Sequence, residues 1–209
     1  MKPQIVLLCF FICFSIENTR GQNPIKLKNA SFEADRPSCC SLPSEWVDLG
    51  VEDQTPPDIQ PGFFQVLMQA QNGLNYIGLV VRENNTWEGL GQRLSDVLKK
   101  DSSYTFSLWL SRSNVYKSAT RLSTELSNFN SPTILKIWGY NTKNKQEELL
   151  AESLPVSHSK WVRYEFVLNP TLTDYNELDL MAYYAPGYEK TNGNLLIDDC
   201  SSIVKIEGK

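Results

Sequence analysis

The sequence contains a single histidine in 209 residues, which limits the catalytic chemistry open to it. His158 stands in the turn VSHSK before an expected strand, and we interpret it as a surface residue rather than a base. The chain also lacks a Gly-x-Ser-x-Gly turn, a His-Glu-x-x-His motif and a glycine-rich phosphate loop. Glu83 and Glu88 are candidates for a carboxylate pair acting on a glycosidic bond, but nothing in the sequence fixes their separation. We therefore predict a protein that is not an enzyme.

A block of basic residues is missing as well. Lys and Arg number 20 against 24 Asp and Glu, which gives a formal net charge of −4. Such a chain is a poor binder of nucleic acid and of anionic membranes. Beyond the N-terminus no segment is apolar enough to cross a bilayer, so we predict no membrane span in the mature protein.

One long apolar run, Ile5 to Ile16, follows Lys2 at the N-terminus. It is too short and too near the terminus to span a bilayer comfortably, and it predicts a secretory signal peptide over residues 1–21. A retained anchor is the alternative. Residues 22–209 contain no repeat and no linker, and they predict one domain. We expect a protein that is secreted, held at the cell surface or located in the periplasm.

Three cysteines remain after the signal peptide: Cys39, Cys40 and Cys200. An odd number in an exported protein leaves one cysteine unpaired or bonded to another chain. Adjacent cysteines rarely bond each other because the ring is strained. A bridge between Cys200 and either Cys39 or Cys40 is the plausible one, and the pairing stays open.

Alternation between apolar and polar residues recurs along the chain. KWVRYEFVL, for example, places Val162, Tyr164 and Phe166 on one face and Trp161 and Arg163 on the other. Turn clusters rich in Asn, Gly and Pro separate such segments. Similar patterns occupy residues 75–81, 133–140, 177–184 and 194–206. Strands at this spacing, with little helix between them, predict an all-β sandwich or jelly roll.

The stretch WEGLGQRLSDVLKKDSSYTFSLWL (87–110) fits two interpretations. Its first half spaces apolar residues as an amphipathic helix would, whereas its second half alternates as a strand does. A helix would contain Gly89 and Gly91, each costing about 1 kcal/mol relative to alanine. We favour two strands joined by a short connection. In that arrangement both glycines face the same side as Trp87 and leave room for a flat ring beside it.

The same stretch resembles the middle of carbohydrate-binding modules with a galactose-binding-like jelly roll. In those modules a Trp-x-Gly-x-x-Gln strand leads to a Tyr-Thr-Phe-Ser strand, and here WEGLGQ begins at Trp87. NASFEAD (29–35) resembles the Asn-x-x-Phe-Glu segment near the start of these modules. LLIDDCSSI (195–203) resembles their closing strand. The resemblance covers most of the chain and implies a galactose-binding-like β-sandwich that binds polysaccharide or glycan without catalysis.

A longer pattern resembles one subgroup, a module found in secreted and cell-surface proteins of Bacteroidetes. PPDIQPGFFQV (56–66), YIGLVVRENNTWEG (76–89) and ILKIWGY (134–140) carry this likeness. The subgroup often has cysteines where Leu49 and Ser103 stand here, so its disulfide pattern does not transfer. Since such modules are often joined to adhesion domains, the alternative function is a protein-interaction or adhesion module of the cell envelope.

The resemblance also implies a structural calcium ion. In such a jelly roll the first and last strands lie side by side, which brings the carboxylates of Glu33 and Asp198 together. Ca²⁺ takes six to eight oxygen ligands, and carboxylates with backbone carbonyls supply them. We predict Glu33 and Asp198, ahead of Asp199, as the ligands. The alternative is a pair of solvated strand-end carboxylates.

Tryptophans that share a face with polar residues are candidates for a sugar site. Sugars stack their C–H faces on indole rings and need planar polar partners for their hydroxyls. Tryptophans are more often core residues, and we assign Trp46 and Trp161 to the core. Asn84 also begins the sequon Asn-Asn-Thr, where an attached glycan would argue against a sugar-binding face. The predicted ligand-binding residues are Arg82, Asn84, Trp87, Glu88, Trp109 and Trp138.

Overall fold

The computed structural model describes residues 23–51 and 56–207, so the predicted signal peptide lies outside the described residues. Strands dominate, and no α-helix occurs in these two ranges. One 3-10 turn, η1, covers Phe63–Gln65. The strands are β1 Val47–Asp48, β2 Asp58–Gln60, β3 Tyr76–Val81, β4 Gly89–Leu98, β5 Tyr104–Ser111, β6 Lys117–Ala119, β7 Leu126–Asn128, β8 Thr133–Asn141, β9 Gln146–Glu152, β10 Val162–Leu168, β11 Tyr175–Tyr184, β12 Gly193–Asp198 and β13 Val204–Lys205.

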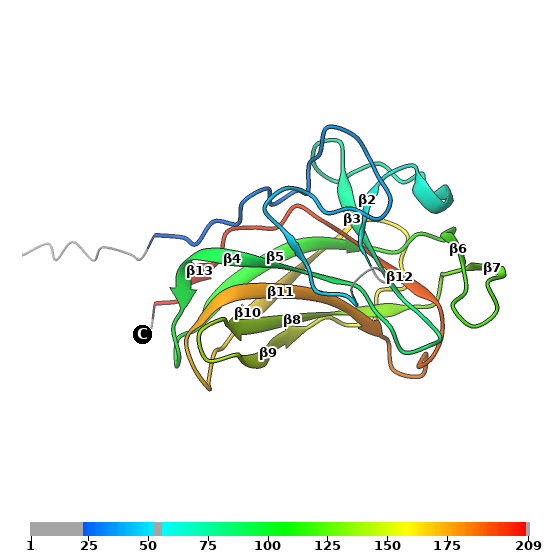
Figure 1. Cartoon of the computed structure of the whole chain (residues 1–209). Helices are drawn as coiled ribbons and strands as arrows, with labels where there is room; N and C mark the ends of the chain where they lie inside the picture. Colours follow the sequence, from blue (N-terminus) through cyan, green and yellow to red (C-terminus); the bar gives the residue numbers. More distant parts are fainter. Residues whose placement is uncertain (1–22, 52–55, 208–209) are drawn as a thin grey trace, which may run out of the picture.

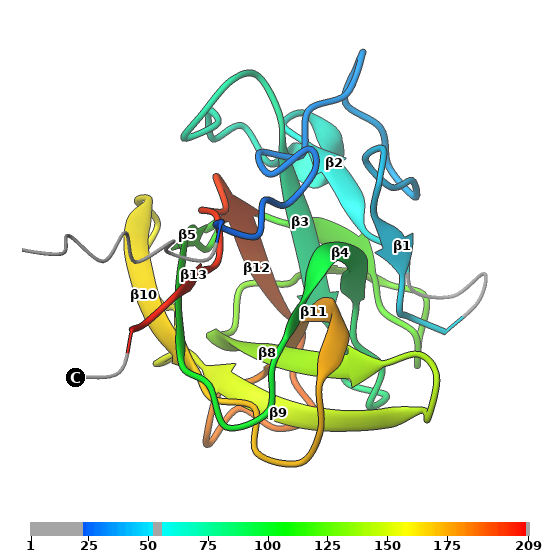
Figure 2. The same ribbon diagram turned by 90° about the vertical axis from the view of Figure 1, so that its left-hand side faces the viewer.

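Two antiparallel sheets pack face to face (Figures 1 and 2). One has five strands in the order β1-β4-β11-β8-β9, and the other has the order β10-β5-β12-β3-β2 with β13 paired to β5. A short hairpin of β6 and β7 stands apart from both. This arrangement is a β-sandwich jelly roll, and the predicted fold class is confirmed.

The stretch 87–110 forms two strands, β4 and β5, as predicted. The segment SDVLKKDSS (95–103) is the expected connection, but β4 continues through its first four residues and ends at Leu98. Leu98 is fully buried and ends the strand in the core. Only a short turn therefore separates the two strands, which belong to different sheets.

The main core lies between the two sheets. On β11, Leu178, Leu180 and Ala182 point into it, and every second residue points out. A second apolar cluster covers the outer face of the six-stranded sheet, around Tyr76, Tyr116 and Phe129. The outer face of the five-stranded sheet has no such cover along β11 and β8 among the described residues.

Trp46 and Trp161 occupy apolar surroundings, as predicted. Trp46 is 5 % exposed and lies 5.1 Å from Phe32, centroid to centroid. Trp161 is half-buried against the second cluster, edge-on to Tyr76 at 5.2 Å. Its Nε1 donates to the carbonyl of Gln69 at 2.8 Å. Both indoles therefore stabilise loops on the sandwich.

The first and last described segments lie side by side. Ile25 and Ile203 exchange two backbone hydrogen bonds of 2.9 and 2.8 Å. The predicted bridge to Cys200 is wrong: Cys39, Cys40 and Cys200 are all free thiols. Cys200 is buried in the core, whereas Cys39 and Cys40 are exposed. Within residues 23–51 and 56–207, no helix is long and apolar enough to cross a membrane.

Candidate functional site: the outer face of the five-stranded sheet

The middle of the five-stranded sheet carries aromatic and charged side chains on its outer side. Strand register places Asp179 of β11 between Gly91 of β4 and Trp138 of β8. Two residues along, Glu177 lies between Arg93 and Tyr140. We call the outward side chains of these three strands, together with Trp87, the aromatic face. Its members are Trp87, Arg93, Lys136, Trp138, Tyr140, Glu177, Asp179, Met181 and Tyr183.

Two polar atoms at the centre of the aromatic face are buried without a partner. Among the described residues, neither Asp179 Oδ1 nor Trp138 Nε1 has a hydrogen-bond partner. Asp179 is 8 % exposed, and burial together with the negative charges of Glu177 and Glu147 raises the pKa of its carboxyl to about 7. Buried polar groups are nearly always hydrogen-bonded in native proteins, so this acceptor and this donor mark a place on the aromatic face where a bound water or a polar ligand would find hydrogen-bond partners.

One end of the aromatic face is a stack of rings. Trp87 and Tyr183 lie with centroids 4.9 Å apart and an interplanar angle of 30°. The ammonium of Lys136 lies 4.4 Å from the centroid of the Tyr183 ring. Since β11 rises by about 3.4 Å per residue, Glu177 and Tyr183 are about 20 Å apart, which suits a short chain of sugars better than a single one.

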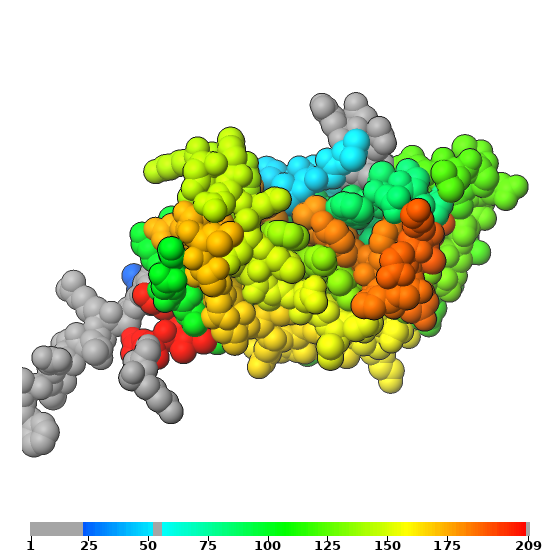
Figure 3. Space-filling view, turned by 90° about the horizontal axis from the view of Figure 1, so that it is seen from below, coloured from blue at the N-terminus to red at the C-terminus, as the bar shows by residue number. Residues whose placement is uncertain are grey.

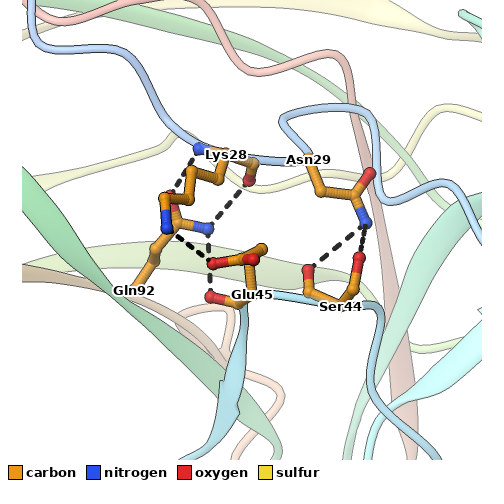
Figure 4. Close-up of polar contacts among 5 residues, drawn as sticks. All are labelled: Lys28, Asn29, Ser44, Glu45 and Gln92. Carbon is orange, nitrogen blue, oxygen red and sulfur yellow. Dashed lines mark hydrogen bonds and ion pairs between the residues drawn. The ribbon is translucent and has the colours of Figure 1, made fainter.

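The other end of the aromatic face opens into a hollow of about 530 Å³. Arg93 and Glu177 line it and form an ion pair, with Nε and Oε2 2.6 Å apart. Gln92 forms its floor: the buried amide bonds to the backbone N–H and C=O of Lys28 and to the carbonyl of Glu45 (Figure 4). The chain before β1 is thereby fixed to β4, and it becomes a wall of the hollow.

Figure 3 views the molecule from the side on which β8 and β9 lie in Figure 1. The yellow-green residues of the β8–β9 hairpin stand out at one end of this surface, and the orange chain that follows β11 lies at the other. The hairpin carries Lys145, whose ammonium lies 5.9 Å from the centroid of the Tyr140 ring.

The space expected beside the glycines is already filled. A Cβ at Gly89 would lie 2.8 Å from Cγ of Met181, and one at Gly91 would lie 2.6 Å from Asp179 Oδ1. The glycines therefore admit side chains of the neighbouring strand and not a ligand ring. Their lack of a side chain is what allows Asp179 to lie flat against β4.

Arg82 and Glu88 require a correction, because both side chains are buried and neither lies on a surface that a ligand could reach. They are 6 % and 1 % exposed and form an ion pair with each other. Burial raises the pKa of Glu88 to about 8, although Arg82 opposes the rise. Glu83, the other half of the predicted carboxylate pair, instead accepts the backbone N–H of Arg121 at 2.7 Å.

Of the other predicted ligand-binding residues, two lie on the aromatic face, one lies in a turn and one lies on the six-stranded sheet. Trp87 and Trp138 belong to the aromatic face. Asn84 lies in the turn before β4 and accepts a hydrogen bond from Thr86. Trp109 lies on the six-stranded sheet, across from Arg163 of β10. A hollow of about 440 Å³ adjoins that strand pair, lined by Ser107, Arg163 and other residues. Arg163 is already engaged there with Ser107 and Glu165, so the aromatic face is the better candidate.

Glu33 and Asp198, the predicted calcium ligands, approach the same segment. Glu33 accepts the N–H of Leu74 at 3.0 Å, and Asp198 accepts those of Gln71 and Asn72 at 2.7 and 3.0 Å. N–H groups cannot ligate a cation, so the oxygen set that Ca²⁺ needs is only partly present. In the described part of the chain, no group of three or more acidic, His or Cys side chains is arranged to hold a metal. Calcium stays a prediction at this place.

Asp179, Tyr183, Glu177 and Arg93 were not predicted. The sequence carries a signal for the first three, because ELDLMAYY alternates them with Leu178 and its apolar partners. That pattern marks an outward position but not a ligand site. Burial of Asp179 arises only when β4 and β8 lie on either side of it.

Comparison with solved structures gives matches over nearly the whole chain. A cyclase from Fischerella sp. TAU is 14% identical with a TM-score of 0.57, covering 90% of this chain and 98% of that one. The CBM22-1 xylan-binding domain of Xyn10C from Paenibacillus barcinonensis is 16% identical, with a TM-score of 0.51 and coverages of 86% and 94%. An arabinose-bound α-L-arabinofuranosidase, MgGH51, is 15% identical with a TM-score of 0.52, but only 26% of its chain is covered.

At these identities the likeness shows the fold alone. No protein-family model matches the sequence, and no curated protein matches it. The chain is thus similar in fold to a carbohydrate-binding module and to a cyclase, and its function has to be argued from its own residues.

Proposed function

We propose that this protein is a non-catalytic glycan-binding module whose ligand lies across the aromatic face. The observation that carries the proposal is the pair of buried, unpartnered atoms, Asp179 Oδ1 and Trp138 Nε1, on neighbouring strands. An acceptor and a donor at the centre of a ring-bearing surface match the mixed apolar and hydroxyl chemistry of a sugar. The likeness in fold to a xylan-binding domain supports the same class of ligand.

The proposal also covers where the protein is located and which modules it is related to. The N-terminal apolar run supports export, and the resemblance to modules of Bacteroidetes surface proteins supports a place at the cell surface or in the periplasm. A polysaccharide of the environment or of the cell envelope is the proposed partner.

The second candidate is a protein-interaction or adhesion module. Leucines on and near the β6–β7 hairpin favour it: Leu122 is 74% exposed and Leu126 is 78% exposed. These leucines are not part of the aromatic face, so the two functions predict different sensitive residues.

A glycan-array screen of the exported form, with and without chelator, tests the proposal. The decisive pair of variants is Trp138→Ala and Trp109→Ala, because each removes one partly exposed indole from a different sheet. We expect Trp138→Ala to weaken binding about tenfold or more, since one stacked ring contributes about 1 to 1.5 kcal/mol beyond its buried area. Trp109→Ala should leave binding unchanged. Loss of binding only in Trp109→Ala would move the site to the other sheet.

A further inference from the structure

Within residues 23–51 and 56–207, no cationic side chain pairs with the acid Asp179. It lies at the centre of β11, 8 % exposed, and its Oδ1 has no hydrogen-bond partner among the described residues. A buried carboxylate is costly unless it is paired or bonded. The carboxylates of Glu177 and Glu147, which act on Asp179, are negative as well.

The cations on the neighbouring strands are engaged elsewhere. Arg93 of β4 forms its ion pair with Glu177, and Lys136 of β8 lies over the ring of Tyr183. Lys145, in the β8–β9 turn, lies over Tyr140. The facing tyrosines are neutral at physiological pH. Asp48 of β1, which pairs with β4, accepts the N–H of Gly50.

The surroundings of Asp179 favour a ligand with a positive charge. Trp138 lies beside Asp179 on the neighbouring strand, and the face of an indole attracts a cation as well as the C–H face of a sugar. A neutral hydroxyl would donate a hydrogen bond to the Asp179 carboxylate but would leave its negative charge uncompensated. An ammonium group would donate the hydrogen bond and would also neutralise the charge.

We infer that the aromatic face selects a glycan carrying a free, protonated amino group, such as a glucosamine oligosaccharide, with Asp179 as the counter-ion of the ammonium. This inference rests on the proposed function, because it names the sugar class for the same site. An N-acetylated sugar lacks the charge and is not selected.

Binding would then be coupled to ionisation. In the free protein the raised pKa of Asp179, about 7, keeps much of the carboxyl protonated in mildly acidic solution. The ammonium requires the ionised form, so its binding releases a proton from Asp179 to the buffer. Affinity for the amino sugar should therefore rise with pH as long as the amine stays protonated.

Isothermal titration calorimetry with length-matched β-1,4 oligosaccharides of glucosamine, N-acetylglucosamine and glucose tests this. Glucosamine and glucose differ only in the amino or hydroxyl group at one carbon. We expect the glucosamine oligomer to bind about tenfold more tightly than the glucose oligomer near pH 6.5. Its affinity should also rise about tenfold between about pH 5 and about pH 6.5. The heat of binding should depend on the ionisation enthalpy of the buffer.

Asp179→Asn keeps the shape of the side chain and removes its charge, so it should abolish the preference for glucosamine and the pH dependence. Glu165→Gln, which removes one negative charge from the opposite sheet, is the matched control and should change neither. Equal binding of glucosamine and glucose oligomers, or a preference that survives in Asp179→Asn, overturns the inference and leaves the proposed function intact. If no glycan binds at all, the proposed function itself fails.

Discussion

Arg82 and Glu88 form an ion pair that the sandwich buries, with 7 % and 1 % of their side chains exposed. The pair spans the β3–β4 turn, and Glu88 also accepts the backbone N–H of Val80 at 2.9 Å. Removing one partner leaves the other as an uncompensated buried charge, whereas removing both does not. This asymmetry gives the first prediction.

Glu88→Met should lower the free energy of unfolding by about 3 to 5 kcal/mol, because Arg82 cannot lose its proton and stays as an unpaired buried charge. The double variant Arg82→Met/Glu88→Met should lose much less, because no charge is left unpaired. Urea unfolding of the single and double variants measures both values. A single variant that loses less than about 1 kcal/mol would show that the pair is hydrated in solution.

Asp179→Asn should stabilise the protein above neutral pH. In the folded state the pKa of Asp179 is about 7, whereas its ordinary value is 3.8. Between these two values the carboxyl ionises in the unfolded chain but stays protonated in the folded protein. The resulting loss of folding free energy is absent below about pH 4, grows between about pH 4 and 7, and reaches its full value above that range. We expect the variant to gain on the order of 4 kcal/mol at about pH 8 and little at about pH 4.

The comparison requires unfolding curves of Asp179→Asn, Glu165→Gln and the unaltered protein at both pH values. A gain of equal size at both would contradict the ionisation account. A gain at high pH would show that Asp179 is held in place at the expense of stability, as expected for a ligand-binding group.

Gly73→Ala should destabilise the segment that joins Glu33 to Asp198. Gly73 has a φ of +68°, and a Cβ there would lie 2.1 Å from Glu33 Oε1. The substitution combines backbone strain with loss of the hydrogen bonds that Glu33 accepts from Leu74 and Asn75. We expect a loss of about 2 to 4 kcal/mol. Gly187→Ala is the control, because its φ is +83° but nothing lies within 4 Å of the added Cβ. It should cost about 1 kcal/mol, and equal losses would rule out the clash.

Calcium, if it binds between Glu33 and Asp198, should raise the melting temperature. An ion that binds only the folded state stabilises by about 2.7 kcal/mol at a hundredfold excess over its dissociation constant. Asp198→Asn should abolish this calcium-dependent part. Differential scanning calorimetry with calcium and with chelator provides the measurement, and identical curves for the unaltered protein would exclude the ion.

The long strands could be predicted from the sequence, whereas the short ones could not. β4, β5, β8, β10 and β11 contain seven to ten residues each, enough for alternation to be visible. β1 has two residues and β2 three, and no periodicity exists at that length. They form because the chain before β3 runs along the sheet edges, which is a property of the assembled fold.

The candidate site was predictable only in part. Trp87 and Trp138 were identified because a tryptophan beside polar residues in a strand points outward. Arg82 and Glu88 look exposed in sequence because they flank an Asn-rich turn. Both are nevertheless buried, and residues far away in the sequence lie next to them. The charge of Asp58 acts on Glu88, and Asp58 accepts a hydrogen bond from Tyr116. A pattern of neighbours along the chain carries no information on such contacts.

The outermost strands have a consequence for solubility. An open strand edge offers unpaired N–H and C=O groups to other chains, and it can start the growth of fibrils. β9, an outermost strand, carries Glu147, Glu148 and Glu152, and a register shift between Ile137 and Trp138 disturbs its pairing with β8. At the opposite ends, β1 and β2 are too short to act as templates. β1, β2 and β9 are therefore poor templates for amyloid-type assembly, which leaves β10, at the other end of the six-stranded sheet, as the outermost strand best able to recruit another chain.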